Sequence, residues 1–329
     1  MDRPGDQPPV VGIVIVLVAA SLFGMLGPLS RFAYEAGMEP LAFVAWRALI
    51  ATVVTSGFVA WRIRRGRSTI VRSGEVSSAA RIALGAAAVA AFSLNLAMFI
   101  AFDRITVALA LLGFYTYPAM VAVVAVALGR ERLDRPKSVA LGLALGGMVL
   151  VVASQLDAAA GLRFDLLGLG LALGAALSQT VFVTLSRDGY RAVPTDQAMA
   201  VILGTTVLLS AALAITSGTG AALAFPFERT DIVPLLVFTG LFSAAIPSLC
   251  FLAGIRIIGG TRAGILMLFE PVVGVGLAAW LLGEALQPIQ LVGGAAILGA
   301  ALILQRSSPS EGTIRPEAIP VERRPTEAP

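Results

Sequence analysis

Long apolar stretches follow one another along most of the chain, separated by short polar segments. Each is about 20 residues long, which is the length that a helix needs to cross the hydrocarbon core of a bilayer. Barrel strands would alternate polar and apolar residues, and these segments do not. The pattern predicts ten membrane-spanning helices, over residues 10–30, 40–61, 82–102, 106–128, 137–156, 165–186, 196–217, 232–254, 262–283 and 288–305.

The chain also repeats itself. Residues 103–156 align with residues 256–309 at a constant offset of 153, which places Pro118 on Pro271 and Glu131 on Glu284. A second match, at an offset of 156, places Leu29, Ser30, Arg31 and Tyr34 on Leu185, Ser186, Arg187 and Tyr190. Because five helices per repeat is an odd number, the second copy must enter the membrane from the opposite side. The predicted fold is all-α and integral to the membrane, with two inverted five-helix repeats over residues 10–156 and 165–305.

Composition supports a membrane protein and excludes several kinds of chemistry. Apolar residues make up 57% of the 329 positions, and charged residues only 13%. The chain has no His and a single Cys, Cys250, so it cannot form an internal disulfide, a zinc cluster or a His-based catalytic triad. We therefore expect no enzyme activity, no metal and no cofactor.

The distribution of basic residues predicts the orientation. With the amino terminus inside, 19 of the 24 Lys and Arg residues fall in the inner segments, four fall outside, and Arg47 lies within a span. This bias favours cytoplasmic termini for residues 1–9 and 306–329, the second of which is Pro-rich and polar and is predicted to be disordered. The net charge of +4 reflects this topology and gives no indication of a nucleic-acid partner.

Two formal charges lie well inside predicted spans, Arg47 and Glu270. Such groups are costly at membrane depth, so they usually pair, face water or act on substrate. Glu270 takes the position of Tyr117 in the other repeat and precedes Pro271, which predicts a helix kink at this point. Glu270 is a candidate for binding a proton or a cationic substrate group, and Arg47 for holding a substrate carboxylate. The structural alternative is an ion pair between the two.

Further polar residues within the spans extend the candidate site. They are Asn95, Tyr115, Tyr117, Ser178, Gln179 and Ser248. Hydrogen bonds between helices are the alternative role for each of them. A second set is predicted to kink helices or to gate the pathway, namely Pro118, Pro247, Pro271, Glu131 and Glu284. Gly142 and Gly146, four residues apart, are predicted to let two helix backbones approach closely.

The segment from Glu270 and Pro271 to Glu284, with its counterpart from Pro118 to Glu131, resembles the EamA-type transporters of the drug/metabolite transporter superfamily. In that family each repeat carries a proline in its fourth helix and a Gly-Glu pair at that helix's end. The first copy departs from this pattern, because Arg130 separates Gly129 from Glu131 and Tyr117 replaces an acidic residue. The resemblance implies a cavity lined by the first four helices of each repeat, with helices five and ten at the periphery.

The resemblance also implies a secondary transporter of the plasma membrane, without an ATP site. The expected function is export of a small organic metabolite such as an amino acid by alternating access, with proton entry through Glu270 as the hypothesis for coupling. Two alternatives stay open, a multidrug or cation exporter of the same fold and a non-transporting membrane scaffold subunit. The expected partners are the substrate, membrane lipid and protons, and a homodimer is left open.

Overall fold

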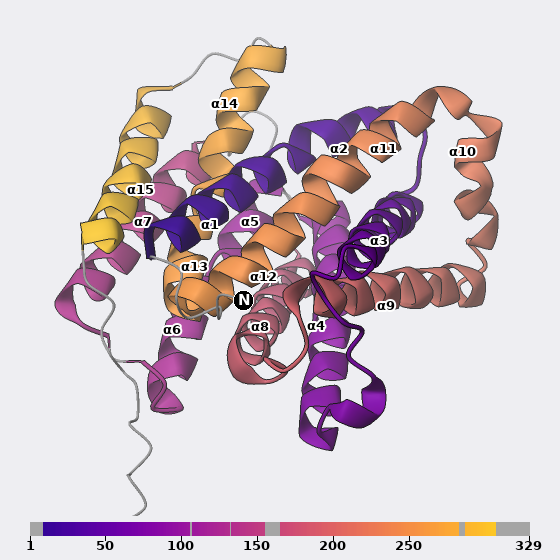
Figure 1. Ribbon diagram of the computed structural model, residues 1–329. Coiled ribbons are helices and arrows are strands. Elements are labelled where there is room, and N and C mark those ends of the chain that lie inside the picture. The colour runs from indigo at the N-terminus through magenta and orange to yellow at the C-terminus, as the bar shows by residue number, and fades with distance from the viewer. Residues whose placement is uncertain (1–8, 106, 132, 155–164, 283–286, 307–329) are drawn as a thin grey trace, which may run out of the picture.

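The computed structural model describes residues 9–105, 107–131, 133–154, 165–282 and 287–306, and these residues form helices joined by short turns (Figure 1). The first half contains α1 (Pro9–Gly24), α2 (Leu26–Glu35), α3 (Pro40–Arg64), α4 (Ser78–Arg104), α5 (Val107–Phe114), α6 (Tyr117–Ala127) and α7 (Arg135–Ala153). The second contains α8 (Leu166–Asp188), α9 (Thr195–Thr216), α10 (Phe225–Glu228), α11 (Val233–Gly240), α12 (Ile246–Ile258), α13 (Gly260–Met267), α14 (Glu270–Leu282) and α15 (Pro288–Arg306). The predicted tails 1–8 and 307–329 lie outside the described residues.

Local sequence explains several of the helix starts. The side chains of Ser77, Asp134 and Asp165 accept hydrogen bonds from backbone N–H groups in the first turns of α4, α7 and α8. These bonds satisfy donors that have no partner within the helix. Pro40 and Pro136 lie in the first turns of α3 and α7, where a missing N–H costs nothing. The polar segments between the apolar stretches therefore mark real helix boundaries.

Seven segments in the described chain are long and apolar enough to cross a membrane. They are Pro40–Arg64, Ser78–Met98, Leu109–Ala127, Arg135–Ala153, Leu166–Asp188, Thr195–Thr216 and Thr230–Ile258, and two shorter apolar helices are Val10–Gly24 and Pro288–Leu304. Fewer segments qualify than the ten that the pattern predicts, because the first, ninth and tenth predicted spans contain only shorter helices. The first bends at Met25, between α1 and α2, and the ninth is divided between α13 and α14.

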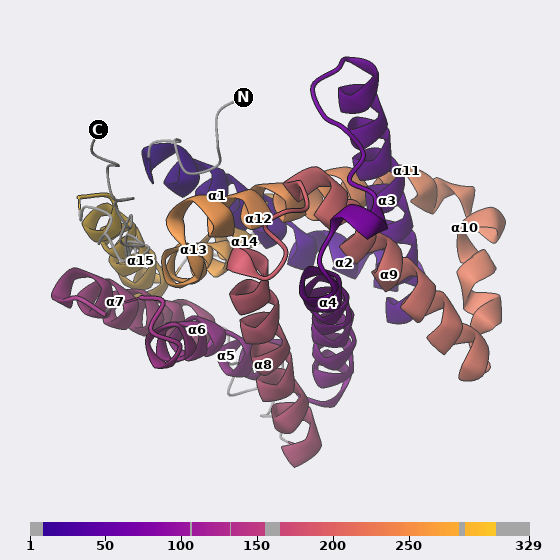
Figure 2. The same ribbon diagram turned by 60° about the horizontal axis from the view of Figure 1, so that its bottom comes forward.

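The most extensive contacts between helices join the two halves of the chain. α4 packs along α8, α1 along α12, α3 along α9 and α7 along α15. The pair α7 and α15 lies side by side at one edge of the molecule in both ribbon views (Figures 1 and 2). The core between the helices is built largely from small and medium-sized apolar side chains, with Tyr115, Tyr117 and Tyr190 among the largest that are fully buried.

Close approach of α7 and α15 depends on a different pair of glycines from the one predicted. A Cβ on Gly147 would lie 2.5 Å from the Gly293 carbonyl oxygen, and a Cβ on Gly293 would lie 2.5 Å from the Gly147 oxygen. Gly142 and Gly146 are exposed, and a Cβ on either would meet open space. The prediction for Gly142 and Gly146 is therefore wrong. Gly142 and Gly146 have the predicted spacing of four residues, but the face of α7 that contacts α15 carries Gly147.

A bulky residue at this contact is expected to weaken the fold. In Gly147→Leu the side chain must push α7 away from α15, and such overpacking typically costs about 1–3 kcal/mol. Gly146→Leu is the matched control, because the same side chain would project from the exposed face of the same helix. Thermal unfolding of both variants in detergent should show a lower midpoint for Gly147→Leu only. Equal midpoints would contradict the close contact.

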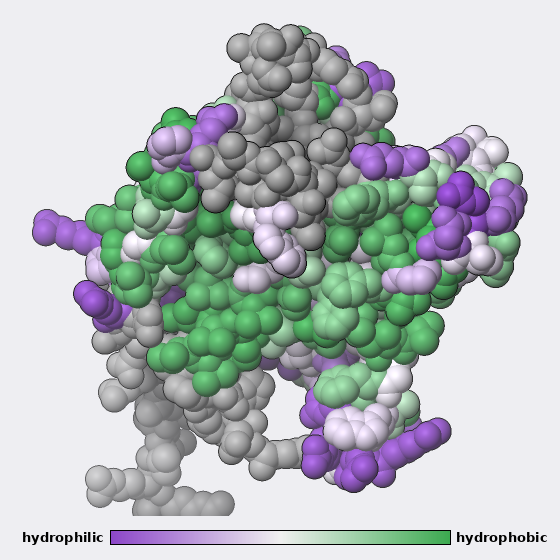
Figure 3. All heavy atoms as spheres, turned by 90° about the horizontal axis from the view of Figure 1, so that it is seen from above, coloured by the Kyte–Doolittle hydropathy of each residue, from purple (hydrophilic) through white to green (hydrophobic). Residues whose placement is uncertain are grey.

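The outer surface suits a membrane environment. Large apolar side chains are exposed along many helices, among them Val53, Val123, Leu208, Ile215 and Trp280. Figure 3 shows hydrophobic side chains gathered across the middle of one face, with hydrophilic ones towards its margins. Exposed apolar surface on this scale is unfavourable in water and favourable against lipid tails. The helices and this surface together define an integral membrane protein.

Candidate functional site

A partly open cavity of about 230 Å³ lies between the helices. Its walls come from α1 to α6 in the first half of the chain and from α8, α9, the segment Leu241–Ala245 and α12 to α14 in the second. Neither α7 nor α15 contributes a lining residue. These two helices lie at the edge of the molecule, as the resemblance to EamA-type transporters implies for helices five and ten. The lining is mainly apolar, with a few polar groups, which is typical of small-molecule sites.

Many lining residues pair with one another when the two repeat offsets are continued beyond the matched stretches, and two pairs, Phe114 with Met267 and Tyr117 with Glu270, lie within the match itself. At the offset of 156 the pairs are Phe23 with Gln179, Leu26 with Phe182 and Arg47 with Leu203; at the offset of 153 they are Ala91 with Ala244, Asn95 with Ser248, Met98 with Phe251, Phe114 with Met267 and Tyr117 with Glu270. Both members of each pair line the same cavity. The two repeats therefore contribute equivalent positions to one central site, but not equivalent charges.

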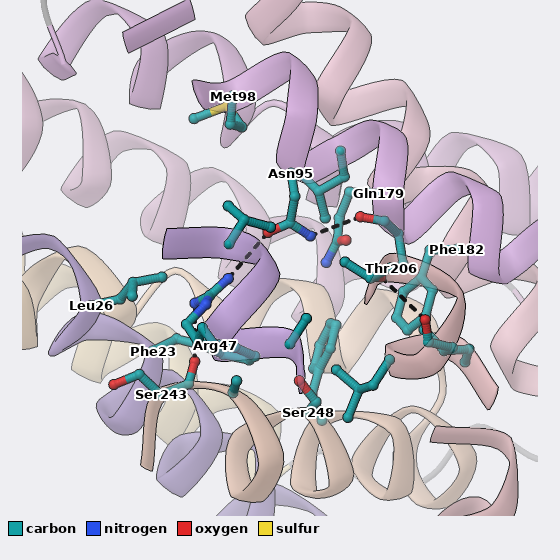
Figure 4. A pocket seen from close by; sticks show the side chains of 18 of the residues that line it. Phe23, Leu26, Arg47, Asn95, Met98, Gln179, Phe182, Thr206, Ser243 and Ser248 are labelled. Atoms are coloured by element: carbon teal, nitrogen blue, oxygen red, sulfur yellow. Dashed lines mark hydrogen bonds between the residues drawn. The ribbon is translucent and has the colours of Figure 1, made fainter. Parts of the chain in front are cut away.

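Arg47 is held at the wall of this cavity by two neutral acceptors. Its side chain donates a hydrogen bond to Asn95 Oδ1 at 3.2 Å and another to the Ser243 carbonyl oxygen at 3.3 Å (Figure 4). Asn95 is itself oriented by a bond from its Nδ2 to the Ala91 carbonyl oxygen at 2.8 Å. The residue Arg47 is only 8% exposed. Within the described residues, no carboxylate oxygen lies within 4.0 Å of its guanidinium nitrogens.

Glu270 lies across the same cavity, at the first residue of α14. Tyr115 and Tyr117 are its neighbours, and Arg47 is close enough for an electrostatic interaction without forming a salt bridge. The hydroxyl group of Tyr117 is buried and has no hydrogen-bond partner among the described residues. Arg47, Tyr117 and Glu270 all line the same cavity. The structural alternative of a direct Arg47–Glu270 ion pair does not describe this conformation.

The structure brings together most of the polar residues that the sequence singles out. Arg47, Asn95, Tyr117, Gln179, Ser248 and Glu270 all line the cavity. Tyr115 is fully buried behind the lining, where its ring packs on Phe114 at 5.4 Å between centroids. Ser178 precedes Gln179 on α8 but does not reach the cavity, because successive helical residues point in different directions.

Two hydroxyl residues of the cavity were not predicted, Ser243 and Thr206. Thr206 is bonded to the Ile202 carbonyl oxygen one turn back at 3.1 Å. The Ser243 hydroxyl is buried without a hydrogen-bond partner in the described part of the chain. Ser243 belongs to a π-helical turn over Leu241–Ala245, which the sequence signals only through Pro247 shortly afterwards. Such turns occur frequently at functional sites.

Both repeats interrupt the helix at the same aligned point. Turns interrupt the regular helical hydrogen bonding at Tyr115–Thr116, between α5 and α6, and at Leu268–Phe269, between α13 and α14. The offset of 153 relates these two turns, and Pro118 and Pro271 follow each as the second residue of the next helix. Proline is tolerated there because the first turn lacks internal hydrogen bonds. Tyr117 and Glu270 therefore each begin a new helix at the cavity.

A second polar cluster lies around Glu131, after the end of α6. Its carboxylate accepts a hydrogen bond from Arg187 at the end of α8 and lies 3.7 Å from the Lys137 Nζ of α7. Gly259, between α12 and α13, has a φ of +84°, and a Cβ there would lie 2.7 Å from Glu131 Oε1. The cluster thus joins the loop after α6 to the second half of the chain. Glu284, its predicted counterpart, lies outside the described residues.

Comparison with known proteins identifies the class. An all-helical membrane protein with two repeats around a central cavity has the architecture of a transporter. The family model described as the EamA-like transporter family matches residues 10–153 and 166–306. The chain therefore belongs to the EamA-like transporter family.

Two further comparisons add the fold alone. A solved structure titled "Crystal structure of protein" has a TM-score of 0.71 and 19% sequence identity, and the match covers 90% of this chain and 98% of that one. No curated protein matches the chain.

Proposed function

We propose that the chain is a ten-helix secondary transporter that exports a small organic metabolite such as an amino acid by alternating access. The pairing of lining residues across the repeat carries this proposal. Two inverted repeats around a central site allow one bundle to rock against the other, so that the site faces each side in turn. In this proposal the ninth span consists of α13 and α14, and the protein lies in the plasma membrane with both termini in the cytoplasm.

Helix packing supports a two-fold relation between the repeats, and the odd number of five predicted spans per repeat is what makes that relation an inverted one in this proposal. A two-fold axis that exchanges the repeats converts the contact of the third and sixth spans, α4 with α8, into a contact of the eighth and first spans. That contact is present as α12 with α1. The same axis maps the pairs α3 with α9 and α7 with α15 onto themselves, and both are among the most extensive contacts. The main contacts therefore follow the pattern of this symmetry.

In this proposal Glu131 and Arg187 form part of a cytoplasmic gate. The bias of basic residues favours the inner side of the membrane for the Glu131 cluster. Glu131 belongs to the first repeat, whereas Arg187 and Gly259 belong to the second, so rocking of one repeat against the other must break the contact. Buried ion pairs with good geometry suit such two-state elements, because they are either made or lost. The sequence assigns the corresponding outer position to Glu284.

A cation or multidrug exporter of the same fold is the second candidate. Phe23, Phe114, Tyr117, Phe182 and Phe251 give the cavity an aromatic lining, and Glu270 adds a negative charge. Arg47 argues against this candidate, because its charge in the same cavity repels a cationic drug. An amino acid carries both a carboxylate and an ammonium group and is matched better by the pair of charges.

Transport in proteoliposomes tests the proposal. The purified full-length protein is reconstituted with a pH-sensitive dye inside and challenged with amino acids, other metabolites and cationic drugs. Substrate-dependent proton movement, together with uptake of the labelled substrate, is the expected result. Uptake of cationic drugs alone would favour the second candidate. A folded protein that moves none of the compounds would favour the scaffold alternative.

A further inference from the structure

We propose that Arg47 and Ser243 form a carboxylate-binding subsite, so that the transported metabolite is a largely apolar molecule with one carboxylate group. This inference rests on the transport function proposed above and specifies its substrate class. Arg47 comes from α3 in the first half of the chain, and Ser243 comes from the π-helical turn before α12 in the second. The two meet at the wall of the cavity, where a hydrogen bond of 3.3 Å joins the guanidinium to the Ser243 carbonyl oxygen.

The charge of Arg47 needs a partner that the described residues do not supply at contact distance. A guanidinium has five N–H donors, and the two hydrogen bonds of this one end on neutral oxygens. A buried cation without a close counter-charge is costly in a membrane protein. A substrate carboxylate would provide that charge, because its two oxygens match the guanidinium fork.

Ser243 adds a donor in the same place. Its hydroxyl is buried without a partner in the described chain, and leaving such a group unsatisfied is unfavourable. Rotation of the Ser243 side chain about its Cα–Cβ bond would let a carboxylate held by Arg47 accept this hydrogen bond as well, because the hydroxyl oxygen is fully buried in the empty protein. Continued back to this point, the offset of 153 pairs Ser243 with Ala90 of the regular helix α4, which has neither a hydroxyl group nor a π-helical turn. The subsite is therefore a property of one repeat.

The rest of the cavity limits the remainder of the substrate. Met98, Met199, Phe182 and Phe251 provide an apolar wall, and the volume of about 230 Å³ suits a small molecule. A phosphate would bring up to two negative charges near the Glu270 carboxyl, whereas a carboxylate brings one. An apolar monocarboxylate is the class that satisfies the Arg47 charge and leaves Glu270 available for an ammonium group or a proton.

Binding of matched acid and amide probes tests this subsite. L-leucine with L-leucinamide and L-methionine with L-methioninamide are titrated calorimetrically into the full-length protein in nanodiscs. The titrations are run at about pH 6, where the α-amino group of each amide is still protonated. Each amide then keeps the side chain and the ammonium group and has a neutral carboxamide in place of the carboxylate. We expect the wild-type protein to bind at least one acid about tenfold or more tightly than its amide, because a charge-assisted bidentate contact is lost with the amide. Arg47→Gln should remove this preference, and Arg47→Lys should retain part of it.

A second pair of variants separates the hydroxyl group from general packing. Ser243→Ala is expected to weaken binding of the preferred acid about threefold to tenfold and to leave amide binding unchanged, which is the range for one lost hydrogen bond. Thr205→Val is the control, because it removes a hydroxyl group that is bonded within its own helix α9 and does not line the cavity. It should leave the preference for the acid intact. Size-exclusion profiles confirm that each variant is folded.

The outcomes distinguish the subsite from the transport function. Equal affinities for acid and amide, or no measurable binding of either, would overturn the carboxylate subsite. Uptake of other compounds into proteoliposomes would still support transport in that case. A clear preference for the acid, lost in Arg47→Gln and Ser243→Ala, would support the subsite even if no compound of the transport panel crossed the membrane, and that second result would count against the transport function alone.

Discussion

Replacing Glu270 with Gln is expected to abolish substrate-driven proton movement in proteoliposomes while leaving the protein folded. Glu270 is the only carboxyl group among the described residues that line the cavity. Glutamine has nearly the same shape and can form similar hydrogen bonds, but it cannot bind and release a proton. Because ionisable groups within the membrane are commonly part of ion pathways, we expect the coupled signal to fall to the level of protein-free liposomes.

The matched control for this prediction is Glu228→Gln. Glu228 lies on the exposed helix α10, so the same chemical change falls on the protein surface. This variant should move protons as the wild-type protein does. Coupled transport that survives in Glu270→Gln would show that the proton takes another route. Loss of the signal in both variants would indicate a general loss of activity during purification or reconstitution, and not an effect of the Glu270 carboxyl.

Replacing Glu131 with Gln is expected to lower the free energy of unfolding by about 3–5 kcal/mol, the usual effect of removing one partner from a buried ion pair. The Glu131 side chain is only 9% exposed and contacts both Arg187 and Lys137. Without the carboxylate, these cations face one another in a partly buried site. Denaturant unfolding in a fixed detergent measures the change.

Two further variants test whether the effect comes from the ion pair. The exchange Glu131→Arg with Arg187→Glu should recover only part of the lost stability, since it restores an opposite charge at the contact with residue 187 but places a cation beside Lys137. Asp188→Asn is the control, because Asp188 contacts Arg187 at 3.6 Å but is 41% exposed. It should change the free energy of unfolding by less than about 1 kcal/mol, as expected for an exposed pair. Similar losses in Glu131→Gln and Asp188→Asn would contradict a special role for Glu131.

Much of the fold is predictable from the sequence, because helix length and apolarity are set by the membrane. The long helices α3, α4, α7, α8 and α9 follow the predicted apolar stretches to within a few residues. The interruptions are harder to predict. Leu268 and Phe269 are apolar residues that suit a continuous helix, and only the proline at 271 indicates a change of direction. The π-helical turn over Leu241–Ala245 likewise has a composition that an ordinary helix could have.

The candidate site was predicted in part, for a comparable reason. A charge within an apolar span is conspicuous, so Arg47 and Glu270 stand out directly. Serine and threonine are common in membrane helices and can bond to the preceding turn, so the sequence does not separate Ser243 from Ser178. Helices that are apolar on all sides have no polar face to mark the direction of the cavity. Which face of each helix lines the cavity is decided by packing against helices that are distant in the sequence.

The repeat-related pairs in the cavity have a consequence for the resting state of the protein. If the inward-facing and outward-facing conformations are produced by exchanging the shapes of the two repeats, a fully symmetric lining would give them equal energies. The lining is not symmetric, because Arg47 has Leu203 as its counterpart in the other repeat and Glu270 has Tyr117. These differences in charge make the energies of the two conformations unequal. We therefore expect the empty protein to rest predominantly with one side open even without an ion gradient, and the two charged positions to decide which side that is.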